Sequence, residues 1–301
     1  MYRSIRFHHA AALLLAILAG TAAPASRAGE RTAIHETRAL AASGKLSVNN
    51  IAGTIVVRGW DRNEVAISGT LGEDVEKLDI SGDAGHLSVV VRYPSRTHGN
   101  VDDTQLELRV PARAQLSIDA VSADVQVSDS SGDIDAKSVS GDVRLDVGSG
   151  RIKASTVSGD LSVRAPSYQT TLNSVSGDLT ASGVRGSLSA DTVSGDLSLD
   201  GGRFTTLKLQ SVSGDLNLQL DLDDGGTLNA ETLSGDIELR LPKMPDAKLT
   251  MKTFSGELRN GFAGTGGDDE VRTLTTTLGS GKGEIDLHSF SGDIDVSGNK
   301  R

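Results

Sequence analysis

The chain has 301 residues, with 40 acidic against 30 basic side chains and no cysteine. Its net charge of −10 repels polyphosphate, and no basic cluster overrides that charge, so nucleic acid is excluded as a partner. The same charge excludes simple attraction to anionic lipid, and the lack of cysteine excludes disulfide cross-links.

Residues 1–28 have the three-part pattern of a secretory signal peptide. Arg3 and Arg6 precede an apolar run at 10–19 that is too short to span a bilayer, and small residues follow it. We expect cleavage after Ala28, with Ala25 nearly as favourable. Cleavage there removes three arginines, leaving 27 basic against 40 acidic side chains, a net charge of −13. No later stretch is long and apolar enough for a transmembrane helix, so the sequence predicts an exported chain, periplasmic or extracellular.

Residues 29–42 are expected to form a flexible N-terminal segment, and residues 43–112 to form strands. The stretch 43–112 alternates apolar and polar side chains in short runs, as β-strands do. Because terminal units of repeat proteins are usually atypical, we expect it to open a stack of repeats and cover the first coil. Trp60, the only tryptophan, is expected to pack at this end rather than to bind sugar.

From 113 to 301 the chain repeats the phrase Ser/Thr–apolar–Ser–Gly–Asp. Its apolar residue recurs every 18 residues and then at wider steps: Val121, Val139, Val157, Val175, Val193, Val212, Leu233, Phe254 and Phe290. The last step, from 254 to 290, is twice 18, which predicts one intervening coil with a degenerate motif. Weaker copies lie half-way between the strong ones, so each coil is expected to contain two short strands and two bends.

The side chains within a coil follow the parity of a strand, and no helical period competes after residue 28. Leu161 and Val163 point one way, while Asp160 and Ser162 point the other. One coil cannot fold alone, because ordering each residue costs about 1–2 kcal/mol. Stacked coils share hydrogen bonds and a continuous core. The sequence therefore predicts an all-β fold, a single-stranded parallel β-solenoid with 18-residue coils, right-handed by the general preference for right-handed crossovers.

Each letter of the repeated phrase has a place in the bend between strands. We expect the glycine to adopt φ > 0, and the serine and aspartate to hydrogen-bond the amides that leave the strand ladder. The apolar residue at the second position is expected to join the alternating strand residues in the core.

The order of motifs resembles a known family. Gly53 to Asp61 reads as a Gly-Thr-Ile…Gly-Trp-Asp pattern, Leu108–Pro111 follows, and serial Val-Ser-Gly-Asp phrases come next. This series resembles the bacterial putative-adhesin family of β-strand-repeat proteins, domain of unknown function 4097, over roughly residues 43–298. The resemblance implies an exported β-solenoid of the cell envelope, and it carries over no catalytic residue.

Two columns of polar residues are candidates for a site. The aspartates would stack ~4.8 Å apart and repel one another unless they are exposed and hydrogen-bonded or cations lie between them: Asp142, Asp160, Asp178, Asp196, Asp215 and Asp236. A calcium β-roll is the alternative, although the paired glycines of its signature are missing. The Ser/Thr column is a hydroxyl face for polysaccharide or, as we favour, a row of hydroxyls bonded along the stack: Ser138, Thr156, Ser174, Thr192, Ser211, Thr232, Thr253 and Ser289.

A carbohydrate-active β-helix enzyme is a further alternative, since paired carboxylates can cleave glycosides. No basic or aromatic cluster accompanies any aspartate, and the histidines lack metal-ligand spacing: His35, His86, His98 and His288. We therefore assign no catalytic, cofactor-binding or metal-binding residue and expect no cofactor. The sequence predicts an adhesin-like binding or structural module whose partner is an envelope or surface component, a polysaccharide or a protein.

Overall fold

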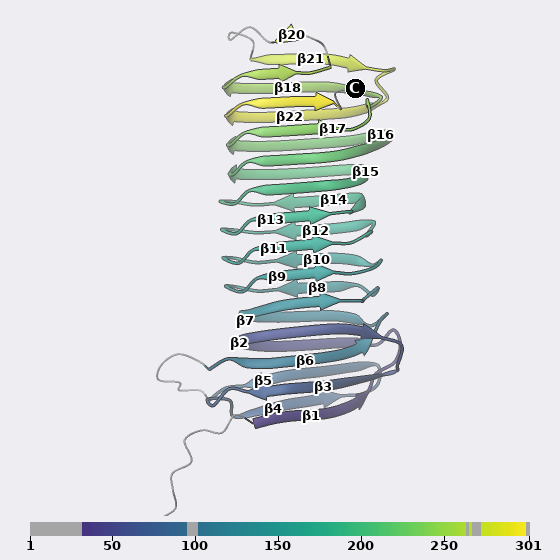
Figure 1. Ribbon diagram of the computed structural model, residues 1–301, viewed down its shortest axis with the longest axis vertical. Helices are drawn as coiled ribbons and strands as arrows, with labels where there is room; N and C mark the ends of the chain where they lie inside the picture. Colours follow the sequence, from purple (N-terminus) through teal and green to yellow (C-terminus); the bar gives the residue numbers. More distant parts are fainter. Residues whose placement is uncertain (1–31, 95–101, 263–264, 267–271, 299–301) are drawn as a thin grey trace, which may run out of the picture. The chain divides into compact units, whose positions relative to one another are not determined.

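The regular structure of the described residues consists of β-strands (Figure 1). All 23 strands are hydrogen-bonded into one continuous sheet. The computed structural model describes residues 32–94, 102–262, 265–266 and 272–298. Over these residues there is no helix that is long and apolar enough to cross a lipid bilayer. The expected signal peptide, 1–28, lies outside the described residues.

The first strands in the chain combine parallel and antiparallel pairing. They are β1 (Thr32–Ala39), β2 (Lys45–Trp60), β3 (Glu64–Leu71), β4 (Lys77–Gly82), β5 (His86–Arg92), β6 (Thr104–Pro111) and β7 (Gln115–Ser128). The long strand β2 pairs parallel with β5, β6 and β7. Antiparallel pairs join β1 to β3, β3 to β6 and β4 to β5. The prediction of a purely parallel solenoid is therefore wrong for this end.

Strand β1 lies in the segment that was expected to be flexible, so that expectation is wrong for residues 32–39. All eight residues of β1 pair with β3. Only Ile34 buries its side chain in the core, while its neighbours are exposed. A strand with one buried side chain has almost no apolar alternation, which is why the sequence pattern did not reveal it.

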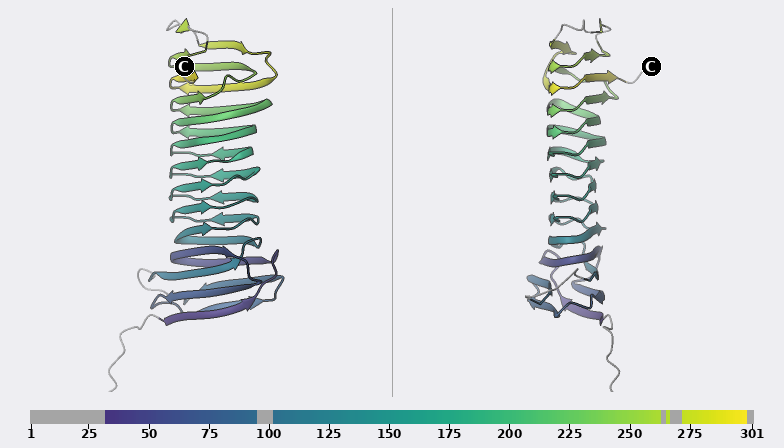
Figure 2. Two further views of the ribbon diagram at one scale, coloured as in Figure 1. Left: turned by 45° about the vertical axis from the view of Figure 1, so that its right-hand side comes forward. Right: turned by 90° about the vertical axis from the view of Figure 1, so that its left-hand side faces the viewer.

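The central coils stack strand on parallel strand. Their strands are β8 (Ile134–Lys137), β9 (Val143–Asp146), β10 (Arg151–Ser155), β11 (Leu161–Arg164), β12 (Gln169–Asn173), β13 (Leu179–Ser182), β14 (Arg185–Asp191), β15 (Leu197–Ser213), β16 (Leu216–Ser234) and β17 (Ile237–Leu241). Equivalent residues pair across coils, so Leu161 lies between Val143 and Leu179. Two layers of strands face each other along the stack (Figure 2). The β-solenoid-like fold predicted from the repeats is confirmed here.

The last strands depart from the order of the sequence. They are β18 (Ala247–Ser255), β19 (Leu258–Asn260), β20 (Thr265–Gly266), β21 (Thr273–Leu278), β22 (Gly283–Ser291) and β23 (Ile294–Gly298). Strand β22 pairs parallel with β16 on one side and β18 on the other, and β23 lies likewise between β17 and β19. The coil formed by β22 and β23 is thus intercalated between two coils that precede it in the chain (Figure 1).

This intercalation corrects the prediction of a degenerate coil between residues 254 and 290. The chain instead forms β21, which pairs antiparallel with β18, and then returns to fill the place below β18. Asp246 stabilises the return turn, because its carboxylate accepts hydrogen bonds from the Ser280 hydroxyl at 2.9 and 2.7 Å. The hydrogen bond from the Ser280 hydroxyl, with smaller contributions from backbone amides of the same turn, lowers the pKa of the Asp246 carboxyl to about 2.

The interior between the two layers is filled by aliphatic side chains. Columns of leucine, isoleucine, valine and alanine run through consecutive coils, and Phe204 is the largest fully buried side chain among the described residues. Thr170 takes a core position between Ile152 and Leu188. At the last coil, buried Asn260 replaces the apolar residue and accepts a hydrogen bond from the Phe262 amide, at 3.0 Å, so this end is closed by a polar group.

Candidate functional site

Each repeated phrase forms a corner that joins the two layers along one edge of the stack, at the left in Figure 1. In one such corner the Gly159 amide donates to the Thr156 hydroxyl at 3.0 Å. The amide of Ser158 donates to the carbonyl of Val139, one coil below, at 2.8 Å. The hydroxyl that accepts from the corner amide thus belongs to the first residue of the phrase, whereas the serine beside the glycine, which was predicted to do so, takes part here through its backbone amide.

The aspartates form a ladder in which each residue binds the next. The amide of Asp160 donates to Oδ1 of Asp142 at 2.9 Å, and the amide of Asp178 donates to Oδ1 of Asp160 at 3.0 Å. We call the whole series the carboxylate column; in spatial order it is Asp124, Asp142, Asp160, Asp178, Asp196, Asp215, Asp236, Asp293 and Glu257. Asp293 precedes Glu257 in this order because of the intercalated coil.

The carboxylate column keeps its negative charge unpaired along the central coils. None of its residues from Asp142 to Asp236 forms an ion pair with a described lysine or arginine. Each Oδ1 accepts an amide, while neighbouring carboxylates at ~4.8 Å repel each other by roughly 1 kcal/mol in water. The column is therefore a line of negative charge that the lysines and arginines of the described residues do not neutralise by ion pairing.

Glycine is required in the corner for a reason other than the predicted one. The expectation of φ > 0 holds for two of the eight corner glycines, Gly256 at 157° and Gly292 at 159°. It is wrong for the other six, whose φ lies outside the range from +20° to +160°: Gly141, Gly159, Gly177, Gly195, Gly214 and Gly235. A Cβ added to Gly177 would lie 2.0 Å from the carbonyl oxygen of Gly159 in the coil below. Only a residue without a side chain permits this approach of two backbones.

The Ser/Thr column is buried and does not form a surface. Its eight residues are between 3% and 7% exposed, and the hydroxyls of two of them, Thr192 and Ser211, have no hydrogen-bond partner among the described residues. The Thr253 and Ser289 hydroxyls donate to carbonyls of the adjacent coil, each at 3.0 Å. The structure thus supports hydroxyls bonded along the stack over a hydroxyl face for polysaccharide.

The apolar residue of the phrase lies outside, contrary to the expectation that it joins the core. The nine side chains from the phrase, together with Ile51, which lies on β2 beside Val121, are between 38% and 68% exposed. We call them the apolar ridge; in spatial order they are Ile51, Val121, Val139, Val157, Val175, Val193, Val212, Leu233, Phe290 and Phe254.

Strand parity explains why the ridge is exposed. Ile152, Ala154 and Thr156 all face inward, so continued alternation puts Val157 on the outside. The signal was present in the sequence, but the apolar character of the column suggested the core. At the end of the ridge the rings of Phe254 and Phe290 stack with centroids 4.9 Å apart and planes 7° apart.

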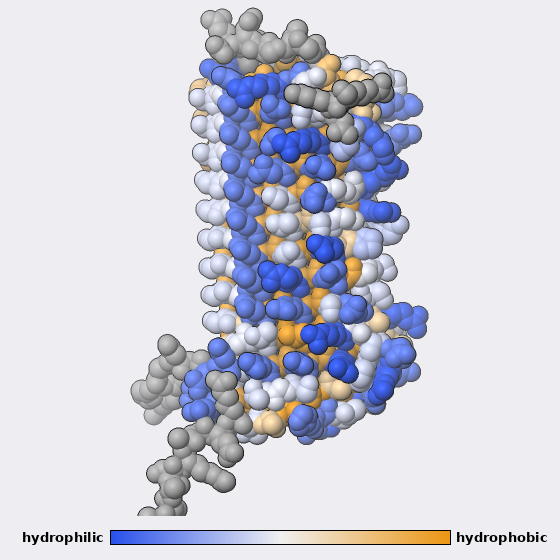
Figure 3. Space-filling model, in the orientation of Figure 1, coloured by the Kyte–Doolittle hydropathy of each residue, from blue (hydrophilic) through white to orange (hydrophobic). Residues whose placement is uncertain are grey.

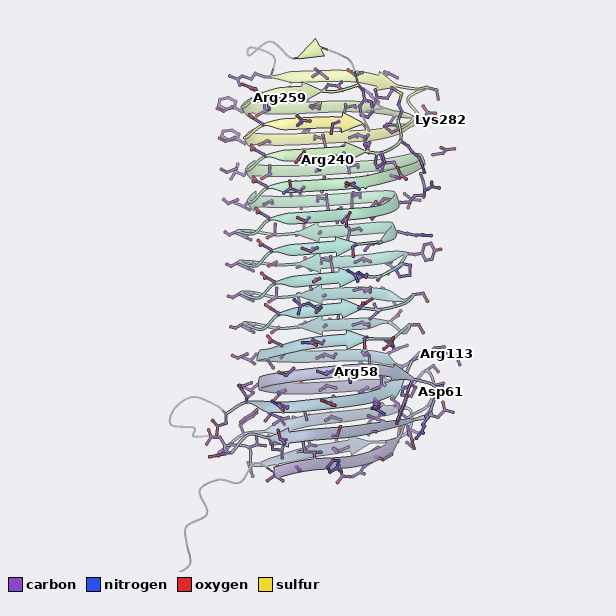
Figure 4. The ribbon with its side chains drawn as sticks, viewed as in Figure 1. Arg58, Asp61, Arg113, Arg240, Arg259 and Lys282 are labelled. Atoms are coloured by element: carbon purple, nitrogen blue, oxygen red, sulfur yellow. The ribbon has the colours of Figure 1, made fainter. Side chains whose placement is uncertain are left out.

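Columns of like side chains cover the described surface. Figure 3 shows hydrophilic side chains in columns that follow the stack, with a continuous hydrophilic column beside a paler one near the left edge. Of the labelled basic residues, Arg240 lies on a sheet face and Arg113 and Lys282 lie at the opposite edge (Figure 4). Arg259 forms an ion pair with Glu257, the last member of the carboxylate column. The corner edge thus combines the apolar ridge with the carboxylate column, which lies three residues later in each phrase and is without ion pairs to described residues from Asp142 to Asp236.

A family model covers most of the chain. The model of the Toastrack family, DUF4097, matches residues 45–297. This protein is a member of the Toastrack family. The resemblance predicted from the motif order is therefore confirmed.

Several solved structures are similar to this Toastrack chain, whereas no curated protein matches it. A putative adhesin from Parabacteroides distasonis is 11% identical, with a TM-score of 0.38 over 89% of this chain and 98% of that one. A putative lipid binding protein from the same organism is 14% identical, with a TM-score of 0.35 over 88% and 95%. A putative cell adhesion protein from Clostridium sporogenes is 11% identical, with a TM-score of 0.26 over 89% and 100%.

The remaining candidates in the Toastrack chain do not converge. His35, His86 and His288 lie on β1, β5 and β22, and His98 lies outside the described residues. No group of three or more histidine, aspartate or glutamate side chains within the described ranges is placed to hold a metal ion. Trp60 is part-buried; its Nε1 donates to the Glu64 carbonyl at 2.8 Å, and Arg62 lies over its ring at 5.1 Å. These contacts support packing of Trp60 rather than sugar binding.

Proposed function

We propose that this Toastrack protein is an exported, non-catalytic binding module of the cell envelope, adhesin-like in its role. Signal-peptide cleavage after residue 28 would deliver it to the periplasm or beyond. Residues 43–112 would form the strands that open a right-handed solenoid of 18-residue coils in residues 113–301. Its partner is an envelope or surface component that contacts many coils at once.

The apolar ridge is the observation that carries this proposal. Ten exposed apolar side chains in a continuous row form a larger apolar feature than the scattered hydrophobic residues of an ordinary surface. Contiguous exposed apolar surface marks interaction sites in proteins. The polar groups beside the ridge are engaged in the corner ladders, so the arrangement offers contact area rather than a reacting group.

The test compares the mature chain with a ridge variant, Val157→Ser/Val175→Ser/Val193→Ser. Both proteins are immobilised and exposed to a glycan array and to envelope extract. We expect the native chain to retain a component that the variant loses. Equal retention by the two proteins contradicts the proposal, and cleavage of any arrayed glycan by the native chain would favour the carbohydrate-active alternative instead.

A further inference from the structure

The partner of the apolar ridge must match both an apolar row and a line of negative charge. In every phrase the exposed apolar residue and the carboxylate are three positions apart, as Val157 and Asp160 are. Both belong to the same corner, and both columns run through the same coils. A small cation would neutralise the carboxylates but leave the apolar ridge uncovered.

Two other occupants fit the charge poorly. A second copy of this chain would bring another carboxylate column to the interface, and it carries 40 acidic against 30 basic residues. A lipid surface would place its phosphates beside the same carboxylates. The central carboxylates have no ion-pair partner within the described chain, so a basic occupant gains attraction without breaking an internal pair.

The spacing of the columns fits a helix better than an extended strand. Coils repeat at ~4.8 Å, whereas a helix rises ~5.4 Å per turn, so five turns drift from five coils by about 3 Å, less than one coil. Side chains on one face of an extended strand repeat at roughly 6.6 Å, so they are displaced from the ridge side chains by about one coil after three coils. The side chains of one helix face can therefore follow the ridge over about 18 residues.

We propose, resting on the function proposed above, that the apolar ridge and the carboxylate column together bind a basic amphipathic helix. Leucine-like side chains of the helix would pack on Val157, Val175 and Val193. Lysine or arginine side chains flanking that stripe would pair with Asp160, Asp178 and Asp196. The partner class is thus a polypeptide whose helix has an apolar stripe bordered by positive charge.

The probe is an 18-residue, fluorescently labelled peptide of leucine and lysine in a helical amphipathic pattern. A second peptide keeps the leucines and replaces lysine by glutamate. Fluorescence anisotropy measures binding to the mature chain at low and high salt. We expect the lysine peptide to bind at least ten-fold more tightly than the glutamate peptide, with an affinity that falls as salt rises.

Three variants of the chain test the two columns separately. Val157→Ser/Val175→Ser/Val193→Ser and Asp160→Asn/Asp178→Asn/Asp196→Asn are each expected to weaken binding of the lysine peptide about ten-fold, and the second is expected to reduce its salt dependence. The matched control, Asp119→Asn/Asp146→Asn/Asp200→Asn, makes the same charge change at exposed aspartates outside the column. It is expected to retain most of the affinity. Circular dichroism verifies that all three variants are folded.

Three outcomes overturn the inference. They are a control variant that weakens binding as much as the column variant, a glutamate peptide that binds as tightly as the lysine peptide, and a native dimer that the valine variant dissociates in sedimentation velocity. If peptide binding fails while a glycan or envelope component is still retained through the ridge, the helix is the wrong partner and the proposed function stands. If the valine variant loses nothing in either experiment, both proposals are wrong.

Discussion

The glycine of each corner is the residue at which one coil most closely approaches the next. In Gly177→Ala the new Cβ would lie 2.0 Å from the Gly159 carbonyl oxygen, and both groups belong to the backbone. We expect a loss of about 3 kcal/mol in the free energy of unfolding, because neither backbone can yield without opening the ladder. Asp178→Asn keeps the acceptor and should cost less than about 0.5 kcal/mol. Urea denaturation that ranks the two variants in reverse would contradict this account of the corner.

Thr170 offers a stabilising substitution. Its side chain is 2% exposed, and its Oγ1 is buried without a hydrogen-bond partner. Thr170→Val replaces the unpaired hydroxyl by a methyl group of similar size, so we expect a gain of about 1 kcal/mol in stability. The matched control is Thr171→Val, at the outward position beside it, which should change stability little. Thermal or chemical denaturation checks the difference, and a Thr170→Val protein less stable than its control is the contrary result.

Single residues show where prediction from the sequence succeeded and where it failed. The corner role of Asp160 could be predicted because a carboxylate beside a bend has few other ways to satisfy the local amides. The reason for Gly159 could not, because the approach of a neighbouring backbone is a property of the stack and not of the local chain. Val157 was predicted in the core and is exposed, because its hydrophobicity favours burial whereas the strand alternation that begins at Ile152 places it on the outside.

At the scale of strands, the intercalated coil should be among the stable parts of the stack. Strand β22 has a parallel partner on each side, although it and β23 are the last strands in sequence. We expect the amides of β22 to exchange with solvent as slowly as those of β12, which is also paired on both sides. Hydrogen exchange followed by NMR or mass spectrometry measures this. Rapid exchange of β22 alongside slow exchange of β12 would argue against the intercalation.

The repeat length can be tested by removing one coil. Deleting residues 142–159 joins Gly141 to Asp160, and Asp160 then takes the place after Gly141 that its equivalent, Asp142, holds in the native chain. We expect the shortened chain to fold with a similar far-ultraviolet circular dichroism spectrum, because each coil contacts only its neighbours. Deleting residues 142–150 joins non-equivalent positions and should prevent folding of the central coils. Similar damage from the two deletions would be inconsistent with an 18-residue coil.

Strand order was predictable only where the repeat was uninterrupted. Equal steps of 18 from Val121 to Val193 leave one way to stack the coils, and those strands pair as expected. The step from Phe254 to Phe290 fits both an added coil and a chain that turns back. The repeat period cannot distinguish these two arrangements, because the pairing of β22 with β16 is a long-range contact that the spacing of motifs does not encode.

The whole molecule is expected to keep its fold without calcium. One oxygen of each central carboxylate accepts a backbone amide, as in the bond from the Asp196 amide to Asp178 Oδ1 at 3.0 Å, and most side chains of the interior are aliphatic. Burial should therefore suffice to stabilise the stack. Circular dichroism of the mature chain in excess chelator should match that with millimolar calcium, with the same melting temperature. A β signal that forms only after calcium is added would support the β-roll alternative.

The intercalated coil also separates the order of synthesis from the order of assembly. A chain that emerges N-terminus first can add strands one by one from β7 to β17, since each of these strands finds a neighbour already in place. Strands β18 and β19 then emerge before the coil on which they rest. A chain cut before residue 283 would lack an internal member of the stack, not an end piece. The stack can therefore be complete only in chains whose residues 283–298 have been synthesised, exported and not removed by proteases.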